Sequence, residues 1–199
     1  MHFEHIWCFS VRHSMLHHNQ GAGLYIDGWD AFILDNWFSG NQGGGIMGGA
    51  YTASVTCTGN RVEWNWTGGF VFRKGDSFNI TGNFFDRSFG PALWLKQAGN
   101  VTVTGNIFRR SGAFDTPFEL DSMNCHVLLE QCRETVITGN TMKKGVGDNG
   151  EGVLSPHHAM ILDGCKSCIV KLNILSNSCV GEAIVIPKHD FEGILDENI

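Results

Sequence analysis

Two short stretches of the chain carry the side chains best suited to acid–base chemistry. The carboxylates are Glu119 and Asp121 in the first stretch and Asp148 and Glu151 in the second, and His157 follows. Hydrolysis of a glycosidic bond needs two carboxyl groups about 5–9 Å apart, one as acid and the other as base or nucleophile. One carboxylate from each stretch would meet that requirement if the fold brings the two stretches together.

A second chemistry is open to the same region. β-Elimination from a uronate needs a base with a pKa near neutrality and cations that bind the substrate carboxylate. His157, His158 and Lys144 are the candidate bases. Arg109 and Arg110 are the candidate partners of the substrate carboxylate. The residue types alone leave both reactions open.

Five cations accompany these stretches, at two adjacent positions of a sequence repeat. Arg87, Arg110 and Lys144 share one position, and Arg109 and Lys143 share the other, below Asp86. Like charges stacked one strand spacing apart repel each other unless something neutralises them. Either the nearby carboxylates neutralise them or the cations bind an acidic ligand, because a guanidinium group matches a carboxylate in shape.

The repeat that must position these side chains is marked by asparagine. Around the asparagine the pattern is constant, as in Val101-Thr-Val-Thr-Gly-Asn106 and Ile80-Thr-Gly-Asn83. An apolar triplet lies ten residues after the asparagine, as Leu93-Trp-Leu does after Asn83. Self-similarity with a period of about 20–50 residues indicates stacked repeats. The seven asparagines are separated by 24, 23, 23, 34, 33 and 25 residues, and they are Asn36, Asn60, Asn83, Asn106, Asn140, Asn173 and Asn198.

Each repeat contains short β-rich runs separated by Gly, Asn, Asp and Ser, which is typical of strands and turns. A repeat of 23 residues fits one coil of a parallel β-helix, whose coils lie about 4.8 Å apart. At that spacing, stacked Asn amides can hydrogen-bond to one another. Asn also tolerates the left-handed conformation that a tight corner needs. The pattern therefore predicts an inward stack of Asn side chains at a corner.

The motif Val-Thr-Val-Thr-Gly-Asn-Ile-Phe at 101–108 resembles the repeats of right-handed parallel β-helix proteins of the pectin-lyase-like superfamily. The resemblance runs from about Phe9 to Ile199. It implies an all-β, single-stranded, right-handed solenoid of about seven to eight coils. That superfamily includes polysaccharide lyases, glycoside hydrolases, epimerases, a fructotransferase group, phage tailspikes and non-catalytic surface proteins.

The resemblance implies a carbohydrate-active protein that acts on or binds an extended acidic polysaccharide, as a hydrolase or a lyase. A non-catalytic structural or adhesion module is the alternative. Both ends of the chain fall within repeats, so we expect residues 1–199 to be one β-helix domain cut from a longer solenoid. We expect that longer parent to be extracellular or periplasmic, although no signal peptide precedes the first coil.

Two of the intervals between asparagines are longer than the rest. The extra residues span roughly 113–124 and 146–158, and both insertions leave the same corner on consecutive coils. Insertions on one face of a repeat protein commonly build its binding face, although solvated loops without a role are the alternative. We predict a groove where the insertions meet. Its catalytic candidates are Glu119, Asp121, Asp148, Glu151 and His157, above substrate-binding Arg87, Arg109, Arg110, Lys143 and Lys144.

An apolar column is predicted to point outward beside the apolar triplets. An exposed apolar strip of this length signals an interface. We predict that a partner subunit covers it, as in trimeric β-helices, or that missing parts of the parent do. Trp94, beside Lys96 and Arg73, is also a candidate platform for stacking a sugar. The column consists of Tyr25, Met47, Val71, Trp94, Leu128, Ile161 and Val185.

Composition narrows the choice of partners. The net charge of −6 provides no general attraction to nucleic acid or to an anionic membrane. No apolar run approaches the roughly 18 residues that span a bilayer. The odd number of cysteines, seven, argues against a disulfide framework. Cys165 and Cys168 have CxxC spacing, but no second pair stands at zinc spacing, so packed free thiols are favoured over a metal or redox role. We predict no cofactor.

Overall fold

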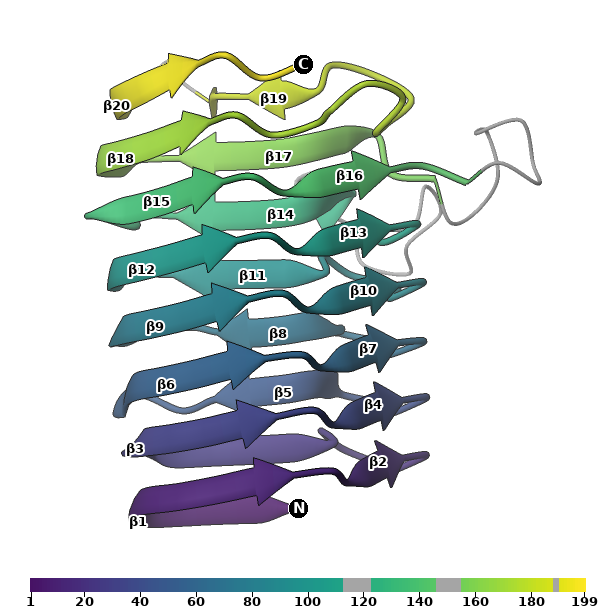
Figure 1. Ribbon diagram of the computed structural model, residues 1–199, viewed down its shortest axis with the longest axis vertical. Coiled ribbons are helices and arrows are strands. Elements are labelled where there is room, and N and C mark those ends of the chain that lie inside the picture. The colour runs from purple at the N-terminus through teal and green to yellow at the C-terminus, as the bar shows by residue number, and fades with distance from the viewer. Residues whose placement is uncertain (113–122, 146–154, 188–189) are drawn as a thin grey trace.

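The computed structural model describes residues 1–112, 123–145, 155–187 and 190–199. The chain winds into a stack of about seven coils, with the N-terminus at one end and the C-terminus at the other (Figure 1). Every strand pairing is parallel and joins one coil to the next. The prediction of an all-β parallel solenoid is confirmed.

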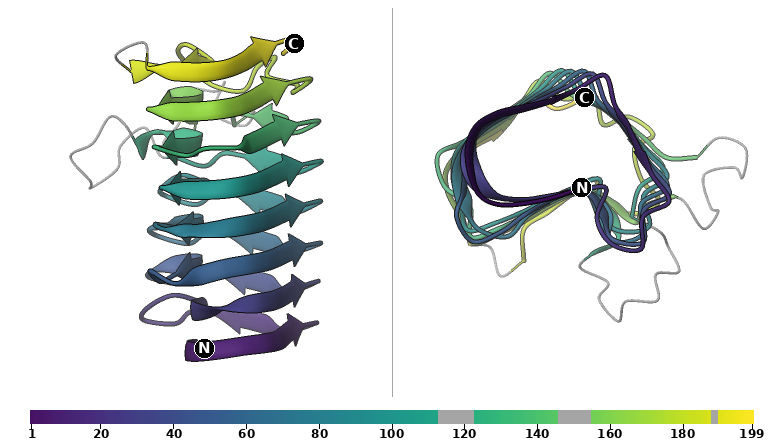
Figure 2. Two further views of the ribbon diagram at one scale, coloured as in Figure 1. Left: turned by 90° about the vertical axis from the view of Figure 1, so that its left-hand side faces the viewer. Right: turned by 90° about the horizontal axis from the view of Figure 1, so that it is seen from below.

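Each coil has three faces, which the end-on view in Figure 2 shows superimposed along the axis. Two long strands, β1 (His2–Arg12) and β3 (Leu24–Leu34), run through both the first and the second face. The remaining strands of the first face are β5 (Gly44–Gly48), β8 (Gly68–Phe72), β11 (Leu93–Lys96), β14 (Cys125–Glu130), β17 (His158–Asp163) and β19 (Ile184–Val185).

The second and third faces complete each coil. The second consists of β6 (Thr52–Thr58), β9 (Gly75–Thr81), β12 (Ala98–Thr104), β15 (Thr135–Thr138), β18 (Cys165–Lys171) and β20 (Phe191–Asp196). The third is a six-stranded sheet of β2 (Met15–His17), β4 (Trp37–Ser39), β7 (Arg61–Glu63), β10 (Phe84–Asp86), β13 (Ile107–Arg109) and β16 (Thr141–Lys143).

The core fills the inside of the stack with one large side chain above another. Phe85 and Phe108, from adjacent third-face strands, stack with ring centroids 4.9 Å apart and planes at 5°. Phe70 meets Phe85 edge-on at 4.9 Å. Burial of a side chain of this size stabilises a fold by about 1.5–3 kcal/mol. Each coil is therefore held mainly by contacts with the coils directly above and below it.

The predicted asparagine stack lies at the corner between the second and third faces. Nδ2 of Asn83 donates to Oδ1 of Asn106 at 3.0 Å, and the Asn83 backbone N–H donates to the same oxygen at 2.9 Å. Nδ2 of Asn83 also donates to the carbonyl of Cys57 at 2.9 Å. The same pattern links all seven predicted asparagines, from Asn36 to Asn198. The ladder prediction is confirmed.

The left-handed residue at this corner is not the asparagine. Gly82 and Gly105, each directly before a ladder asparagine, have φ of 65°. In other coils the same place holds Asp35 or Leu172, also with positive φ. The tolerance of Asn for this conformation is therefore not used. The residue before it makes the turn, as the glycines at 59, 82, 105 and 139 of the repeat indicate, and the Asn backbone is free to donate along the ladder.

A second, shorter asparagine ladder was missed in the sequence. It lies at the corner between the third and first faces, where Nδ2 of Asn41 donates to Oδ1 of Asn65 at 2.9 Å. Asn19 donates to Asn41 in the same way at 2.7 Å. The next coils have Ser88 and Ser111 at this position, and the buried hydroxyl of Ser88 has no hydrogen-bond partner. The ladder therefore ends at Asn65, and one coil, that of Ser88, separates it from the coils that carry the insertions.

The outward apolar column exists, but the chain covers much of it. Leu128 and Ile161 are buried in a small cluster on the outside of the first face, packed with Met123 and Cys125. Val71 is also buried, between its register neighbours Met47 and Trp94. The prediction of a continuous exposed strip is wrong, because residues of this chain already cover these positions. Association with a second subunit stays a prediction.

The cysteines lie in the strand pattern as free thiols. Cys132 and Cys165 occupy the same position on adjacent coils, where their thiols donate to the carbonyls of Leu95 and Leu129. Among the described residues, no three His, Cys, Asp or Glu are arranged to hold a metal ion. The described part of the chain also contains no helix long and apolar enough to cross a membrane.

His126 is the one fully buried histidine among the described residues. Its Nε2 lies 3.1 Å from the carbonyl of Ser178, so Nε2 carries the proton and the unprotonated Nδ1 has no partner. Burial lowers the pKa of His126 to about 4, because the charged ring would lose its hydration.

Replacement of Asn83 by Ala should lower the free energy of unfolding by about 1–3 kcal/mol, because buried donors and acceptors on both neighbouring coils lose their partner. Urea unfolding measures this loss. The matched control is Asn79→Ala, which removes an exposed amide bonded only to the Thr81 hydroxyl. An equal effect of both substitutions would contradict the role of the ladder.

The low pKa of His126 predicts a loss of stability in acid. Between pH 6.5 and pH 4 the unfolded chain binds a proton that the folded chain does not, so the free energy of unfolding falls as the pH drops through this window. The loss attributable to this group is about 3 kcal/mol. Urea unfolding at pH 7 and pH 4 should show a smaller difference for His126→Phe than for the wild type. The exposed control His17→Phe should retain the wild-type difference.

Candidate functional site

The outer surface of the third face brings the five predicted cations together. In its strands the central residue points inward, as Phe85 and Phe108 do, and the flanking residues point outward. The register aligns Glu63, Asp86, Arg109 and Lys143 in one column on four successive coils. The charge in this column therefore changes from negative to positive between β10 and β13.

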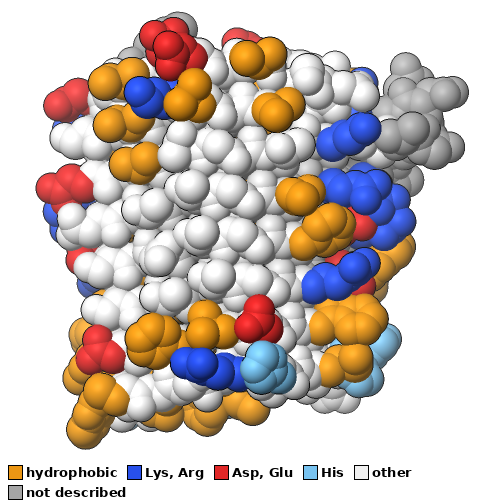
Figure 3. All heavy atoms as spheres, in the orientation of Figure 1, with side chains coloured by type: hydrophobic (Ala, Val, Ile, Leu, Met, Phe, Trp, Pro, Cys, Tyr) orange, Lys and Arg blue, Asp and Glu red, His pale blue; other side chains and the backbone are white. Residues whose placement is uncertain are grey.

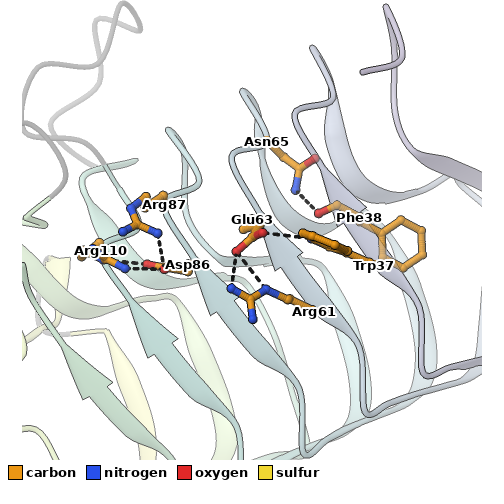
Figure 4. Close-up of polar contacts among 8 residues, drawn as sticks. All are labelled: Trp37, Phe38, Arg61, Glu63, Asn65, Asp86, Arg87 and Arg110. Atoms are coloured by element: carbon orange, nitrogen blue, oxygen red, sulfur yellow. Dashed lines mark hydrogen bonds and ion pairs between the residues drawn. The ribbon is translucent and has the colours of Figure 1, made fainter. Parts of the chain in front are cut away.

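The first negative group is held by a tryptophan and an arginine. Glu63 is 5% exposed, although it lies on the outer side of its strand. Its carboxylate accepts hydrogen bonds from Nε1 of Trp37 at 2.9 Å and from Nε of Arg61 at 3.0 Å (Figure 4). The Arg61 guanidinium also lies over the rings of Trp37 and Phe84, at 5.7 and 5.2 Å.

The second negative group is held by two arginines. Asp86 is 1% exposed, and its Oδ1 accepts from Nε of Arg110 at 2.8 Å. Its Oδ2 accepts from Arg110 and, at 2.7 Å, from Nη1 of Arg87 (Figure 4). Arg87 lies in turn over the ring of Trp64, at 4.9 Å. Asp86 and Glu63 are thus saturated with donors, and this arrangement suits anchoring groups rather than a general acid or base.

The remaining cations have no such partner. Within residues 1–112, 123–145, 155–187 and 190–199, Arg109, Lys143 and Lys144 form no ion pair. Lys143 is exposed, and the other two are half-buried. Figure 3 shows Lys and Arg side chains gathered at the right-hand edge of the molecule, with hydrophobic side chains between and below them. Among the described residues, this end of the third face therefore carries positive charge without a paired carboxylate.

Exposed aromatic side chains accompany the charge. Trp64 lies beside Arg87, and Trp66 packs on Phe89 of the next coil with ring centroids 5.1 Å apart. Both tryptophans are exposed. Aromatic rings offer a broad apolar face next to a polar edge, which suits the faces and hydroxyls of a sugar. The sequence signal that could have found Trp64 is its repeat position, four residues after Asn60, which is the position of Arg87 on the next coil.

The described ends of the two insertions meet at this corner. The backbone of Gly112, where the first insertion begins, lies against the backbone of Cys125, just after it ends. The Gly145 N–H donates to the hydroxyl of Ser155 across the second insertion, at 3.2 Å. The coils that carry them are neighbours, since β14 pairs with β17. The catalytic candidates Glu119, Asp121, Asp148 and Glu151 lie outside the described residues.

The fifth catalytic candidate, His157, lies at the start of the first face. Its ring meets that of His158 edge-on at 4.7 Å, and its backbone N–H donates to Oδ1 of Asn124 at 2.9 Å. Nδ1 of His158 lies 2.7 Å from the carbonyl of Glu182, which fixes that ring. His157 is exposed where the second insertion returns to the coil.

Trp94 belongs to a separate group. It projects from β11 on the first face, where its ring lies 4.7 Å from the Arg73 guanidinium and its Nε1 donates to Glu130. Glu130 also pairs with Lys96 at 3.0 Å. Among the described contacts, none joins Trp94 to the five cations, so the two sets of predicted binding residues lie on different faces of the coil.

Comparison with known structures returns proteins with the same fold. The A-module of the mannuronan C-5 epimerase AlgE6 from Azotobacter vinelandii superimposes with a TM-score of 0.71 at 15% identity, over 92% of this chain and 50% of the epimerase module. The DFA-IIIase of Arthrobacter chlorophenolicus without its lid gives 0.65 at 17%, over 89% and 43%. The Dettilon tailspike protein gives 0.58 at 15%, over 85% and 44%.

The chain therefore spans half or less of the length of these proteins, and at this identity the likeness establishes the fold. A family model described as the right-handed β-helix region matches residues 4–155. Because that match covers most of the chain, and the coils described above supply its strands, the protein belongs to the right-handed β-helix family.

Proposed function

We propose that this β-helix binds an extended acidic polysaccharide along the outer surface of the third face. The observation that carries the proposal is the group formed by Arg109, Lys143 and Lys144, whose positive charge has no carboxylate partner among the described residues. Stacked cations one strand spacing apart repel each other. A ligand with regularly spaced carboxylates would relieve that repulsion on successive coils.

The neighbouring coils show why these cations are available. Asp86 neutralises Arg87 and Arg110, and Glu63 neutralises Arg61, so the acidic half of the column is satisfied within the protein. The cationic half of the column begins at Arg109, on the coil after Asp86. Trp64 and Trp66 extend the surface beyond the charge and offer apolar faces to sugar rings.

We further propose that the insertions carry out the chemistry, as hydrolysis or elimination of the bound polysaccharide. One carboxylate from Glu119 or Asp121 would face one from Asp148 or Glu151, with His157 as an additional acid or base. The support is the meeting of the described insertion ends on adjacent coils, above the cations. Binding without turnover is the second candidate, and the saturated carboxylates Glu63 and Asp86 favour it for the described residues.

Binding tests the first part of the proposal. The double substitution Lys143→Gln/Lys144→Gln should weaken binding of polygalacturonate about threefold to tenfold, because each exposed charge contributes up to about 1 kcal/mol. Calorimetric titration measures the change, and added salt should weaken wild-type binding in the same direction.

A matched control removes the same charge elsewhere. Arg12→Gln/Lys171→Gln, on the second face, should leave the affinity within about a factor of two, because only distant charge is lost. Asp86→Asn should act in the opposite direction and strengthen binding, since it releases Arg87 and Arg110. Equal losses in both double variants would reduce the effect to net charge and overturn the site.

Product analysis tests the second part. Glu119→Gln, Asp121→Asn, Asp148→Asn, Glu151→Gln and His157→Gln are each assayed on polygalacturonate, alginate and a neutral polysaccharide. Loss of a catalytic acid or base should lower the rate at least about a hundredfold while binding persists. New reducing ends without unsaturation indicate hydrolysis, and ultraviolet-absorbing unsaturated ends indicate elimination. Turnover that survives all five substitutions would remove this mechanism, and binding without turnover in the wild type would favour the non-catalytic module.

A further inference from the structure

The corner between the first and second faces carries a groove along the axis of the solenoid. One hollow, of 410 Å³, is lined by Trp29, Tyr51, Lys74, Asp76 and Arg133. A second, of 520 Å³, is also lined by Arg133, so the two hollows are neighbours on either side of this residue. The corner lies at the left in Figure 1 and faces the viewer in the left-hand view of Figure 2.

One end of the groove is aromatic. Trp7 and Trp29, register partners in β1 and β3, stack with ring centroids 6.0 Å apart and planes at 12°. Trp7 is 60% exposed and Trp29 is 44% exposed. Tyr51, which lines the same hollow as Trp29, is 70% exposed. Three large aromatic side chains left this open form a platform rather than a part of the core.

Beyond the aromatic end, the groove contains planar polar side chains that are held by hydrogen bonds to neighbouring side chains. Nε2 of Gln97 donates to Oε1 of Gln131 on the next coil at 2.9 Å. The carboxylate of Asp76 accepts from Asn100 at 3.0 and 3.1 Å and from Ser77 at 2.7 Å. The hydrogen bonds from Asn100 and then Ser77 lower the pKa of Asp76, which keeps this acceptor ionised.

Charges of both signs alternate along the groove. Arg133 lies 3.6 Å from Asp76 and 2.9 Å from Glu134. The remaining charged groups of the two linings are Lys74, Lys166, Asp163 and Asp190. Positive and negative side chains lie together along the left edge in Figure 3. This surface therefore offers many hydrogen-bonding groups but no net field that would attract an anion, unlike the third face.

We propose that this groove is a second binding site, for an uncharged oligosaccharide that lies along the axis. Sugar rings would stack on Trp29 and Tyr51, because the apolar face of a sugar matches an aromatic ring. Their hydroxyls would bond to Asp76, Gln97 and Arg133, which are held in place before the ligand arrives and so lose little freedom on binding. The site shares no residue with the third-face site and does not depend on the proposed function.

Calorimetric titration of the full chain tests the proposal. The uncharged probes are cellohexaose, xylohexaose and maltohexaose, and the charged probe is the hexamer of galacturonate. At least one uncharged probe should bind. Trp29→Ala, Tyr51→Ala and Asp76→Asn should each weaken that binding about tenfold, which corresponds to the loss of one good contact. Trp29→Phe should restore part of it, since a ring returns to the platform.

Two controls separate this groove from other surfaces. Phe32→Ala removes an exposed aromatic side chain from the same strand, outside both hollows, and should change nothing. Lys143→Gln/Lys144→Gln should leave the uncharged probe unaffected. Absence of binding by all three uncharged probes overturns the proposal. The proposal is also overturned if the uncharged probe still binds with wild-type affinity to both Trp29→Ala and Tyr51→Ala, provided that these variants melt at the wild-type temperature. It is likewise overturned if the galacturonate hexamer binds more tightly than the uncharged probes and its binding depends on Trp29 and Tyr51.

Discussion

The structure depends on one geometric constraint, the spacing of about 4.8 Å between parallel strands on successive coils. At that distance a side chain meets its equivalent on the next coil, so each position must be able to stack on itself. A buried amide can do so, because Oδ1 of one asparagine accepts both the backbone N–H and Nδ2 of the preceding one. Phenylalanine can do so through its rings, as Phe85 and Phe108 show. Like charges inside the core cannot, and the charged columns lie on the outer side of the strands, where Glu63 and Asp86 are paired with arginines.

The same constraint acts on the outer columns. Stacked like charges are tolerated only with counter-charges or with a ligand. Asp86 meets this need for Arg87 and Arg110 by facing two guanidinium groups at once, whereas no described carboxylate pairs with Arg109 or Lys143. At the opposite corner, Arg133 is balanced by Asp76 and Glu134. One solenoid thus presents a surface of single charge on one side and a balanced surface on the other.

The periodic features were predictable, and the features that depend on side-chain direction were not. The interval between Asn60 and Asn83 fixes the coil, and the coil fixes which residues share a column, so the grouping of the cations followed from the sequence. The counter-ion role of Asp86 depends on the direction in which Arg110 extends, which the repeat does not specify. The burial of Leu128 depends on Met123, which lies outside the repeat. Glu119 and Asp148 lie in the insertions, outside the sequence repeat, so the repeat predicts no column for them.

The asparagine ladder has a consequence for what the fold can carry. Nδ2 of Asn106 bonds to Asn140 at 3.0 Å across 34 residues of chain, and Nδ2 of Asn83 bonds to Asn106 at 3.0 Å across 23. The stack therefore has the same dimensions whether or not a loop leaves the coil. The insertions leave the coils at the corner between the third and first faces, so this corner is a natural place to graft unrelated peptides. Two grafts on adjacent coils would be displayed about 4.8 Å apart at their bases, as a scaffold for engineered recognition.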